Sequence, residues 1–212
     1  DYKVTGVQTC ALPISSALRG RKVLILSGPT CEHLDPIRFI TNASSGKMGK
    51  ALAEEARRQG AEVTLVTGPV ADANLPAGPG ISIQRVVSAQ DMLDAGRAAF
   101  AGHDVVIYAA AVSDYRPTRY TDRKMPKDPA GLSLTLESTP DVAATLNRDK
   151  RAGQVAIGFA LQTHDGEARA LEKMRAKRFD GIVLNGPEAL GREGGQYTFF
   201  DAATGQAAAW GA

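Results

Sequence analysis

The sequence predicts an α/β fold built on a doubly wound, mostly parallel sheet with a small closing hairpin. Short apolar runs alternate with helical segments along the chain, and Gly and Pro residues separate them. The apolar runs are continuous rather than alternating, which is typical of strands buried on both faces. A regular strand–helix order of this kind favours a Rossmann-like sheet over an antiparallel one.

The first elements form a βαβ unit. Residues 22–27 are an apolar strand that ends at Gly28-Pro29, and a polar loop covers residues 29–45. Residues 46–49 open a helix whose apolar face holds Met48, Ala51, Leu52 and Ala56, and Gly60 ends it. Residues 63–66 form the second strand, which stops at Gly68-Pro69.

The remaining elements repeat this alternation after a Pro- and Gly-rich loop at residues 71–80. Residues 116–130 are polar and hold three prolines, which predicts an exposed loop. The elements expected around that loop are strands at 81–87, 105–108, 155–159 and 182–185, a half-exposed strand at 132–136, helices at 89–100, 141–146 and 168–178, and a closing hairpin formed by 197–200 with the stretch near 210.

Length and composition indicate one globular domain. The chain has 212 residues, 43% hydrophobic and 23% charged. Residues 1–16 show no clear periodicity and are interpreted as a linker remnant or artefact, so residues 17–212 are the expected domain, truncated at its C-terminal end. Only two cysteines are present, without the spacing of a disulfide framework or a metal site, which predicts reduced thiols and a cytoplasmic location.

Charge and hydropathy exclude two classes of partner. The 25 basic and 23 acidic residues leave a net charge of +2, which argues against a dedicated nucleic-acid-binding domain. No apolar run approaches the roughly 18 residues that a membrane helix needs. We therefore expect small-molecule partners, with no nucleic acid and no membrane.

Four predicted strands end in unusual residues. These ends are Ser27-Gly28-Pro29-Thr30, residues 109–114, residues 159–162 and Asn185-Gly186. Ligands of doubly wound sheets bind outside the carboxyl ends of the strands. The convergence of the four ends predicts a binding site at this edge of the sheet.

The segment 42–49 (NASSGKMG) stands at a predicted helix start. Gly and Ser residues let main-chain N–H groups approach an anion, and the helix dipole favours phosphate there. The segment is not a Walker A loop, because Thr41 stands where the first Gly is required and Met48 where Ser or Thr is required. From spacing alone, anion binding and a simple helix start with a solvated lysine stay open as alternatives.

Other candidate residues also have two interpretations. Asp114 could accept a hydrogen bond from a nucleotide, or it could cap local structure. Lys124 and Lys127 could close over a triphosphate, or they could be solvated loop residues. An NAD(P)-binding oxidoreductase is an alternative function, but the first strand lacks a G-x-G-x-x-G turn and the second ends in Thr67-Gly68 rather than an acid. A non-catalytic nucleotide-binding module is the other alternative.

Taken together, these motifs resemble the phosphopantothenoylcysteine synthetase domain, the C-terminal half of a bifunctional coenzyme A biosynthesis flavoprotein. The resemblance covers about residues 21–210. Its most specific part is the block 35–49 (DPIRFITNASSGKMG). Supporting matches are residues 27–30, 66–69, 110–115, 139–141, 158–160 and Asn185.

The resemblance implies an acid–amino-acid ligase that joins 4′-phosphopantothenate to L-cysteine. The carboxylate attacks the α-phosphate of CTP, pyrophosphate leaves, and the cysteine amine then displaces CMP from the acyl-cytidylate. It also implies a homodimer. It further implies Mg²⁺, which would screen charge on the pyrophosphate, and no residue of the chain is expected to be a metal ligand. FMN would be needed only if a decarboxylase half precedes this domain in the full-length protein.

The resemblance also assigns the site residue by residue. Asn42 matches the asparagine that contacts the acyl intermediate, and Lys124 matches the loop lysine on the triphosphate; both are expected to be catalytic. Arg38, Asn42 and Lys127 are expected at the substrate site or dimer interface. The expected nucleotide-binding set is Gly28, Ser45, Gly46, Lys47, Tyr108, Ala109, Ala110, Asp114, Lys124, Pro140, Asp141, Val142, Ala143, Phe159, Lys173 and Lys177.

Two positions depart from the family pattern. The lysine-rich loop commonly reads Lys-x-Lys-Lys, and here Pro126 stands between Met125 and Lys127, which removes one cation and stiffens the loop. Gln162 stands where a Glu often follows the Gly-Phe-Ala motif. Both departures concern the surroundings of the site rather than Asn42 or Lys124.

Overall fold

The computed structural model describes residues 17–162, 164–186 and 196–210. Its main element is an eight-stranded sheet in the order β12-β11-β10-β9-β6-β1-β4-β5. The parallel strands are β1 (Lys22–Ser27), β4 (Glu62–Thr67), β5 (Ile81–Arg85), β6 (Val105–Tyr108), β9 (Val155–Leu161) and β10 (Gly181–Asn185), and the antiparallel hairpin β11 (Tyr197–Asp201) and β12 (Ala207–Trp210) extends the edge next to β10.

The six parallel strands follow the Rossmann order. Counted along the chain as 1 to 6, they lie as 3-2-1-4-5-6, so the order reverses between β1 and β6. The chain runs to β4 and β5 on one side of β1 and then crosses to β6 on the other side. A crevice outside the carboxyl ends of β1 and β6 is therefore the expected ligand site.

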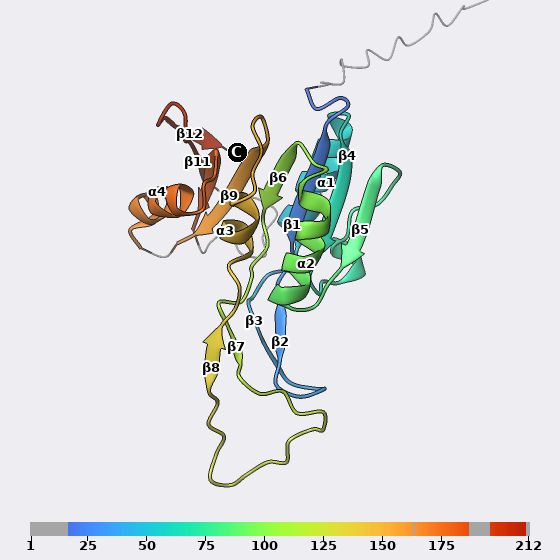
Figure 1. Ribbon diagram of the computed structural model, residues 1–212, viewed down its shortest axis with the longest axis vertical. Helices are drawn as coiled ribbons and strands as arrows, with labels where there is room; N and C mark the ends of the chain where they lie inside the picture. Colours follow the sequence, from blue (N-terminus) through green and yellow to red (C-terminus); the bar gives the residue numbers. More distant parts are fainter. Residues whose placement is uncertain (1–16, 163, 187–195, 211–212) are drawn as a thin grey trace, which may run out of the picture.

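Two apolar clusters hold helices on opposite faces of the sheet (Figure 1). Val23 and Ile25 of β1 point toward α1 (Lys47–Arg58), whereas Leu24 and Leu26 point to the other face. That face is covered by α2 (Ala89–Phe100), α3 (Val142–Asn147) and α4 (Gly166–Ala176). The burial of β1 on both faces explains why its sequence is a continuous apolar run. We call the sheet and these four helices the body.

Two short hairpins project from the body (Figure 1). One pairs β2 (Cys31–His33) with β3 (Phe39–Thr41), and the other pairs β7 (Tyr115–Pro117) with β8 (Leu136–Ser138). A loop of residues 118–135 joins β7 to β8, and its ends are closed by a hydrogen bond from the Thr118 N–H to the Thr135 carbonyl, 3.0 Å. We call these two hairpins with their connecting loops the lobe.

The structure confirms the fold class, the parallel strands of the body and the closing hairpin. The helices predicted at 89–100, 141–146 and 168–178 are present as α2, α3 and α4, although α4 begins two residues earlier than expected. The helix face assigned to α1 needs correction, because Gly49, Ala53 and Ala56 are buried and Ala51 is exposed. The interpretation of residues 1–16 falls outside the described residues.

The lobe is where the sequence-based expectations were wrong. The segment 29–45 was expected to be a loop, but it contains the β2–β3 hairpin. The expected strand at 132–136 is a strand only from Leu136 to Ser138, where β7 supplies a pairing partner. Leu132 and Leu134 alternate as in a strand, yet both are exposed because no second surface covers them.

No helix in the part of the chain that the structure describes is long and apolar enough to cross a membrane.

Candidate active site

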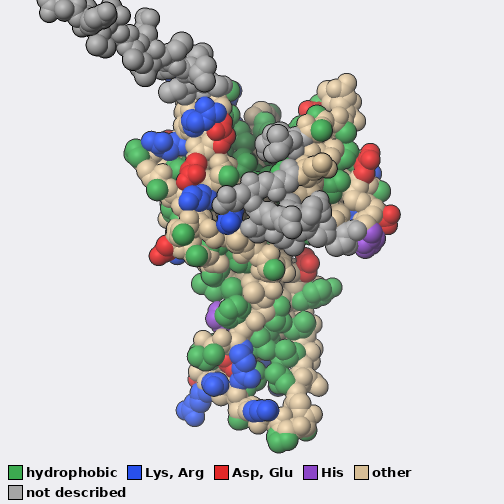
Figure 2. All heavy atoms as spheres, turned by 180° about the vertical axis from the view of Figure 1, so that it is seen from behind, with side chains coloured by type: hydrophobic (Ala, Val, Ile, Leu, Met, Phe, Trp, Pro, Cys, Tyr) green, Lys and Arg blue, Asp and Glu red, His purple; other side chains and the backbone are tan. Residues whose placement is uncertain are grey.

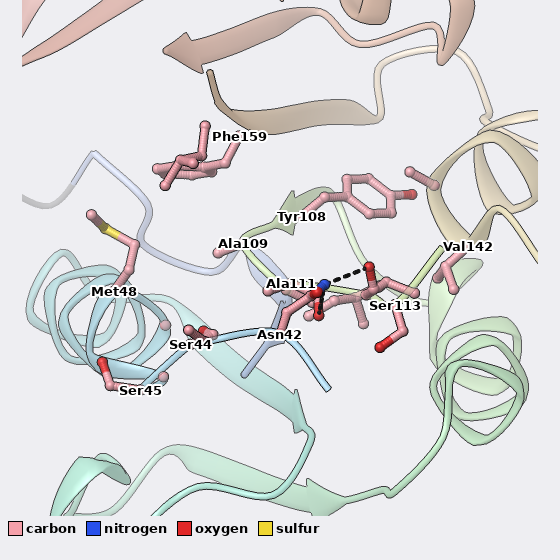
Figure 3. Close-up of a pocket in the computed structure, with 18 of the residues that line it drawn as sticks. Asn42, Ser44, Ser45, Met48, Tyr108, Ala109, Ala111, Ser113, Val142 and Phe159 are labelled. Carbon is pink, nitrogen blue, oxygen red and sulfur yellow. Dashed lines mark hydrogen bonds between the residues drawn. The ribbon is translucent and has the colours of Figure 1, made fainter. Parts of the chain in front are cut away.

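A cavity of about 1160 Å³ opens at the carboxyl ends of the strands (Figure 3). It lies at the reversal of strand order, where the chain leaving β6 approaches the chain leaving β1. The Ala111 N–H donates to the Gly28 carbonyl at 2.9 Å, which holds the two strand ends together. The lining includes the predicted residues Asn42, Ser45, Gly46, Lys47, Tyr108, Ala109, Ala110, Asp114, Pro140, Asp141, Val142, Ala143, Phe159, Lys173 and Lys177.

One wall of the cavity is the start of α1. Gly46 precedes the helix with φ 78° and makes no side-chain capping bond, while the Lys47 N–H donates to Ser45 Oγ at 3.4 Å. Because this contact is long, an acceptor from outside the helix can still bind at the first turn. Together with the positive end of the helix dipole, the N–H groups of this turn form a suitable site for phosphate. A Cβ at Gly46 would lie 2.7 Å from Val70, so both the turn and the space require glycine here.

Asn42 bridges the segment before α1 and the end of β6 (Figure 3). Its side-chain Nδ2 donates to the main-chain carbonyls of Ala111, 3.2 Å, and Val112, 3.1 Å. These two acceptors fix the amide orientation, because the opposite orientation would set its oxygen against two carbonyl oxygens. The Asn42 N–H₂ group thus donates to main-chain carbonyls, and its side-chain oxygen is the polar atom that a ligand could contact.

The chain leaving β6 is firmly held, since the Ala109 N–H donates to the Leu26 carbonyl and the Ala111 N–H to the Gly28 carbonyl, 2.9 Å each. The small side chains of Ala109, Ala110 and Ala111 line the cavity here, which suits close approach of a flat ring. Tyr108 is buried, and its hydroxyl donates to Asn147 Oδ1 at 2.7 Å. Burial, with the charge of Asp141, raises the pKa of Tyr108, so its hydroxyl stays protonated and serves as a donor.

The opposite wall carries two lysines from the end of α4. Lys173 Nζ donates to the Phe159 carbonyl at 2.7 Å, and Lys177 Nζ pairs with Asp141 at 2.9 Å. Burial and the Lys177 charge lower the pKa of Lys173 to about 8. Burial acts to raise the pKa of Asp141, but the Ala144 N–H and the Lys177 ammonium outweigh it and leave that pKa below its usual value.

The structure does not gather every predicted residue in the cavity. Gly28 is absent from the lining and serves the turn after β1 instead, with φ 72° and close packing against Thr67 and Val70. Arg38, Lys124 and Lys127 belong to the lobe and are also absent from the lining. Most of the lining comes from the body and the segments next to it; the lobe contributes Tyr115 and Ser138, but its two lysines are absent from the lining.

Sequence reasoning missed Asn147, which is fully buried. Its Nδ2 donates to the Lys177 carbonyl at 2.8 Å while its oxygen accepts from Tyr108, so one side chain ties β6, α3 and the end of α4 together. The sequence offered only a weak signal for Asn147, namely an Asn at the end of a short, mostly apolar helix. Its partners are distant in sequence and become visible only in the fold.

Within the described ranges, no three His, Cys, Asp or Glu side chains gather as a metal site. Mg²⁺ in phosphate chemistry commonly uses few protein ligands and several phosphate oxygens. If Mg²⁺ entered this cavity with a triphosphate, phosphate oxygens would supply most of its ligands.

The strand order and the crevice at its reversal define a Rossmann-like α/β domain with its cavity at the carboxyl ends of the strands. The family model for the DNA/pantothenate metabolism flavoprotein C-terminal domain matches residues 18–209, and the chain belongs to this family.

Individual relatives support this membership. The chain is 44% identical over 177 residues to the coenzyme A biosynthesis bifunctional protein CoaBC of Bacillus subtilis, covering 84% of this chain and 43% of that protein. It is 45% identical over 168 residues to a cysteine/cysteine sulfinic acid decarboxylase from an unknown prokaryotic organism, covering 79% and 46%. The chain therefore spans less than half the length of these relatives.

A crystal structure of the C-terminal domain of CoaBC superposes with a TM-score of 0.77 at 39% identity, covering 92% of this chain and 88% of that one. The same fold is found in a Cab2 variant crystallised with phosphopantothenate-cysteine, at 16% identity and a TM-score of 0.74.

Proposed function

We propose that this chain catalyses the CTP-dependent joining of 4′-phosphopantothenate to L-cysteine, through 4′-phosphopantothenoyl-CMP. The observation that carries the proposal is a cavity that combines the glycine-led start of α1, two lysines and the Asn42 bridge. Membership in the family and the fold shared with the CoaBC C-terminal domain support it. The product bound to the Cab2 variant is the product expected here.

The two half-reactions make different demands on the site. In the first, the substrate carboxylate oxygen attacks the α-phosphorus of CTP, and the bond to the bridging oxygen of pyrophosphate breaks. Negative charge builds on the phosphates, where the helix start and Lys173 can stabilise it. Mg²⁺ bound to the triphosphate would screen the leaving pyrophosphate. Lys124 is proposed to reach the triphosphate from the lobe.

In the second half-reaction the cysteine amine attacks the acyl carbon, CMP leaves with the electron pair of the broken C–O bond, and the amine loses a proton. Here the acyl group must be held in place. Asn42 lies at the junction of helix start and strand end, and its side chain is fixed by two main-chain carbonyls. We assign it to positioning the acyl intermediate.

The base is proposed to be cytosine rather than adenine. The open main chain after β6 and the exposed Asp114 offer hydrogen-bonding groups beside a flat surface at Phe159. We expect a clear preference for CTP over ATP.

A homodimer is also proposed. Large apolar side chains are exposed on the lobe, which calls for a covering surface. They include Ile37, Phe39, Tyr115, Tyr120, Leu132, Leu134 and Leu136. The lobe of a second copy of the chain would supply such a covering surface. A cytoplasmic location is proposed because CTP and phosphorylated intermediates occur there.

The proposed function is tested by pyrophosphate release with 4′-phosphopantothenate, L-cysteine and one of CTP, ATP or NAD(P), together with mass detection of phosphopantothenoylcysteine. We expect the fastest pyrophosphate release and product formation with CTP, and much slower rates with ATP. Equal turnover with both nucleotides would contradict the proposed base preference. Absence of product with either would contradict the ligase function.

A further inference from the structure

The loop 118–135, which carries Lys124 and Lys127, is held to the β2–β3 hairpin near one of its residues, Met125. Within residues 121–138 Met125 is the residue that is half-buried, and its neighbours in that stretch are exposed. The Met125 N–H donates to Asp35 Oδ2 at 3.2 Å, and its carbonyl accepts from Arg38 Nη2. Both main-chain polar groups of the residue after Lys124 are therefore fixed.

Asp35 is built into the fold as a rigid acceptor. Its side chain is 0% exposed, and its Oδ1 accepts from the N–H groups of Ile37 and Arg38 at 2.8 Å each. Its Oδ2 accepts from Arg38 Nε at 2.9 Å as well as from Met125. Burial acts to raise the pKa, but the three main-chain donors and the Arg38 charge lower it to about 2. The carboxylate is therefore charged under all ordinary conditions.

Arg38 completes the attachment through its fork geometry. One nitrogen contacts Asp35 while another reaches the Met125 carbonyl. A lysine has one ammonium group on a flexible stem and cannot reproduce this fixed two-point arrangement. A second contact also attaches the loop to the segment that holds Asp35, since the Thr121 N–H donates to the Leu34 carbonyl at 3.0 Å.

We propose that Asp35 is a positioning residue for Lys124: directly and through Arg38 it fixes the main chain at Met125 and so sets where the lysine enters the site. This inference rests on the proposed function, in which Lys124 acts on the triphosphate. The alternative is that the ion pair of Asp35 with Arg38 only stabilises the lobe. The two roles differ in one respect, because a positioning role acts through Lys124 and disappears when Lys124 is gone.

The test is a double-mutant cycle on the single-turnover rate of acyl-cytidylate formation. Asp35→Asn keeps the shape but replaces one acceptor oxygen by N–H₂, which only donates, so two of the four donors around Asp35 lose their acceptor. Arg38→Lys keeps the charge and serves as the second variant if Asp35→Asn folds poorly. We expect at least about a tenfold loss in the parent chain and no further loss in a Lys124→Gln background. Equal losses in both backgrounds, or none in the parent, would overturn the inference.

Limited trypsin digestion provides a readout that needs no nucleotide. Cleavage after Arg123 should be faster in Asp35→Asn than in the parent chain, at matched folded fraction. The control is Glu137→Gln, which removes an exposed ion pair with Arg116 elsewhere in the lobe, and it should digest like the parent. Unchanged cleavage in Asp35→Asn rejects the attachment. A parent chain that forms no acyl-cytidylate rejects the proposed function, and the digestion then decides the attachment alone.

Discussion

In the body, large apolar side chains such as Leu24, Ile25 and Val106 are fully buried, whereas in the lobe Tyr120, Leu132 and Leu134 are exposed. Figure 2 shows Lys and Arg side chains gathered toward the end of the lobe, beside exposed hydrophobic ones. The body thus encloses its own core and forms most of the cavity lining. The lobe leaves apolar side chains exposed, and its lysines Lys124 and Lys127 are absent from the cavity lining.

This difference implies a division of roles. Changes in the body should cost folding, because its residues are packed on all sides. Changes at the exposed tip of the lobe should cost rate or assembly while leaving the fold intact. The following predictions test that division.

Gly68→Ala should have the largest effect. A Cβ at this position would lie 1.6 Å from the Pro29 carbonyl oxygen, so main chain at the end of β1 must move. We expect a loss of at least about 3 kcal/mol in the free energy of unfolding. Urea denaturation measures it. The control is Gly102→Ala, whose Cβ would have an ordinary 3.6 Å contact, and similar stability of the two variants would contradict the packing argument.

Lys124→Gln should leave unfolding unchanged and slow the first half-reaction. Its side chain is exposed, and among the described residues nothing pairs with its ammonium. Loss of one electrostatic contact in a closed site costs about 10²–10³ in rate. Single-turnover kinetics measures the step, with Arg97→Gln on the body surface as control. A rate within twofold of the parent would exclude a role for Lys124 in the triphosphate site.

Phe39→Asp should weaken the dimer. Phe39 is 47% exposed on β3, and a carboxylate there cannot be buried against a second copy. We expect dissociation at least about tenfold more favourable, equivalent to about 1.4 kcal/mol. Sedimentation at several concentrations checks it, with Ile83→Asp at the exposed surface of β5 in the body as control. A parent chain that is active and strictly monomeric would refute the covering role of the lobe.

The smallest effect concerns pH and Lys173. Burial, then Lys177, lowers its pKa to about 8, and Asp141 and Asp114 oppose this shift. Above pH 8 Lys173 loses its proton, so CTP affinity should fall several-fold between pH 7 and pH 9. Between about pH 8 and the unfolded value of 10.5, the unfolded chain binds more protons, so this group adds stability as pH rises. Calorimetric titration should give a flatter pH profile for Lys173→Met; identical profiles would contradict the assignment.

The same contrast explains what the sequence could predict. The body strands were predictable because continuous apolar runs with Gly and Pro ends reflect burial on both faces. The place of the cavity followed, since strand ends in such a sheet meet at one edge. The lining residues outside the strand ends, such as Lys173 and Lys177, were expected from the family resemblance. The β2–β3 hairpin was not predictable, because its residues are held by Asp35 and by the loop at Met125, which are tertiary contacts rather than periodic ones. Asn147 was missed for the same reason.

The most direct test of the account compares Asn42→Asp with Lys124→Gln in a quenched single-turnover assay, using labelled 4′-phosphopantothenate and CTP. An ionised carboxylate in place of the Asn42 amide could not donate to the Ala111 and Val112 carbonyls, so the side chain that positions the acyl intermediate would lose its attachment. The account predicts that Asn42→Asp releases pyrophosphate once and accumulates acyl-cytidylate, while Lys124→Gln accumulates none on that time scale. Accumulation in Lys124→Gln and none in Asn42→Asp would contradict the division of roles between Asn42 at the cavity and Lys124 on the lobe.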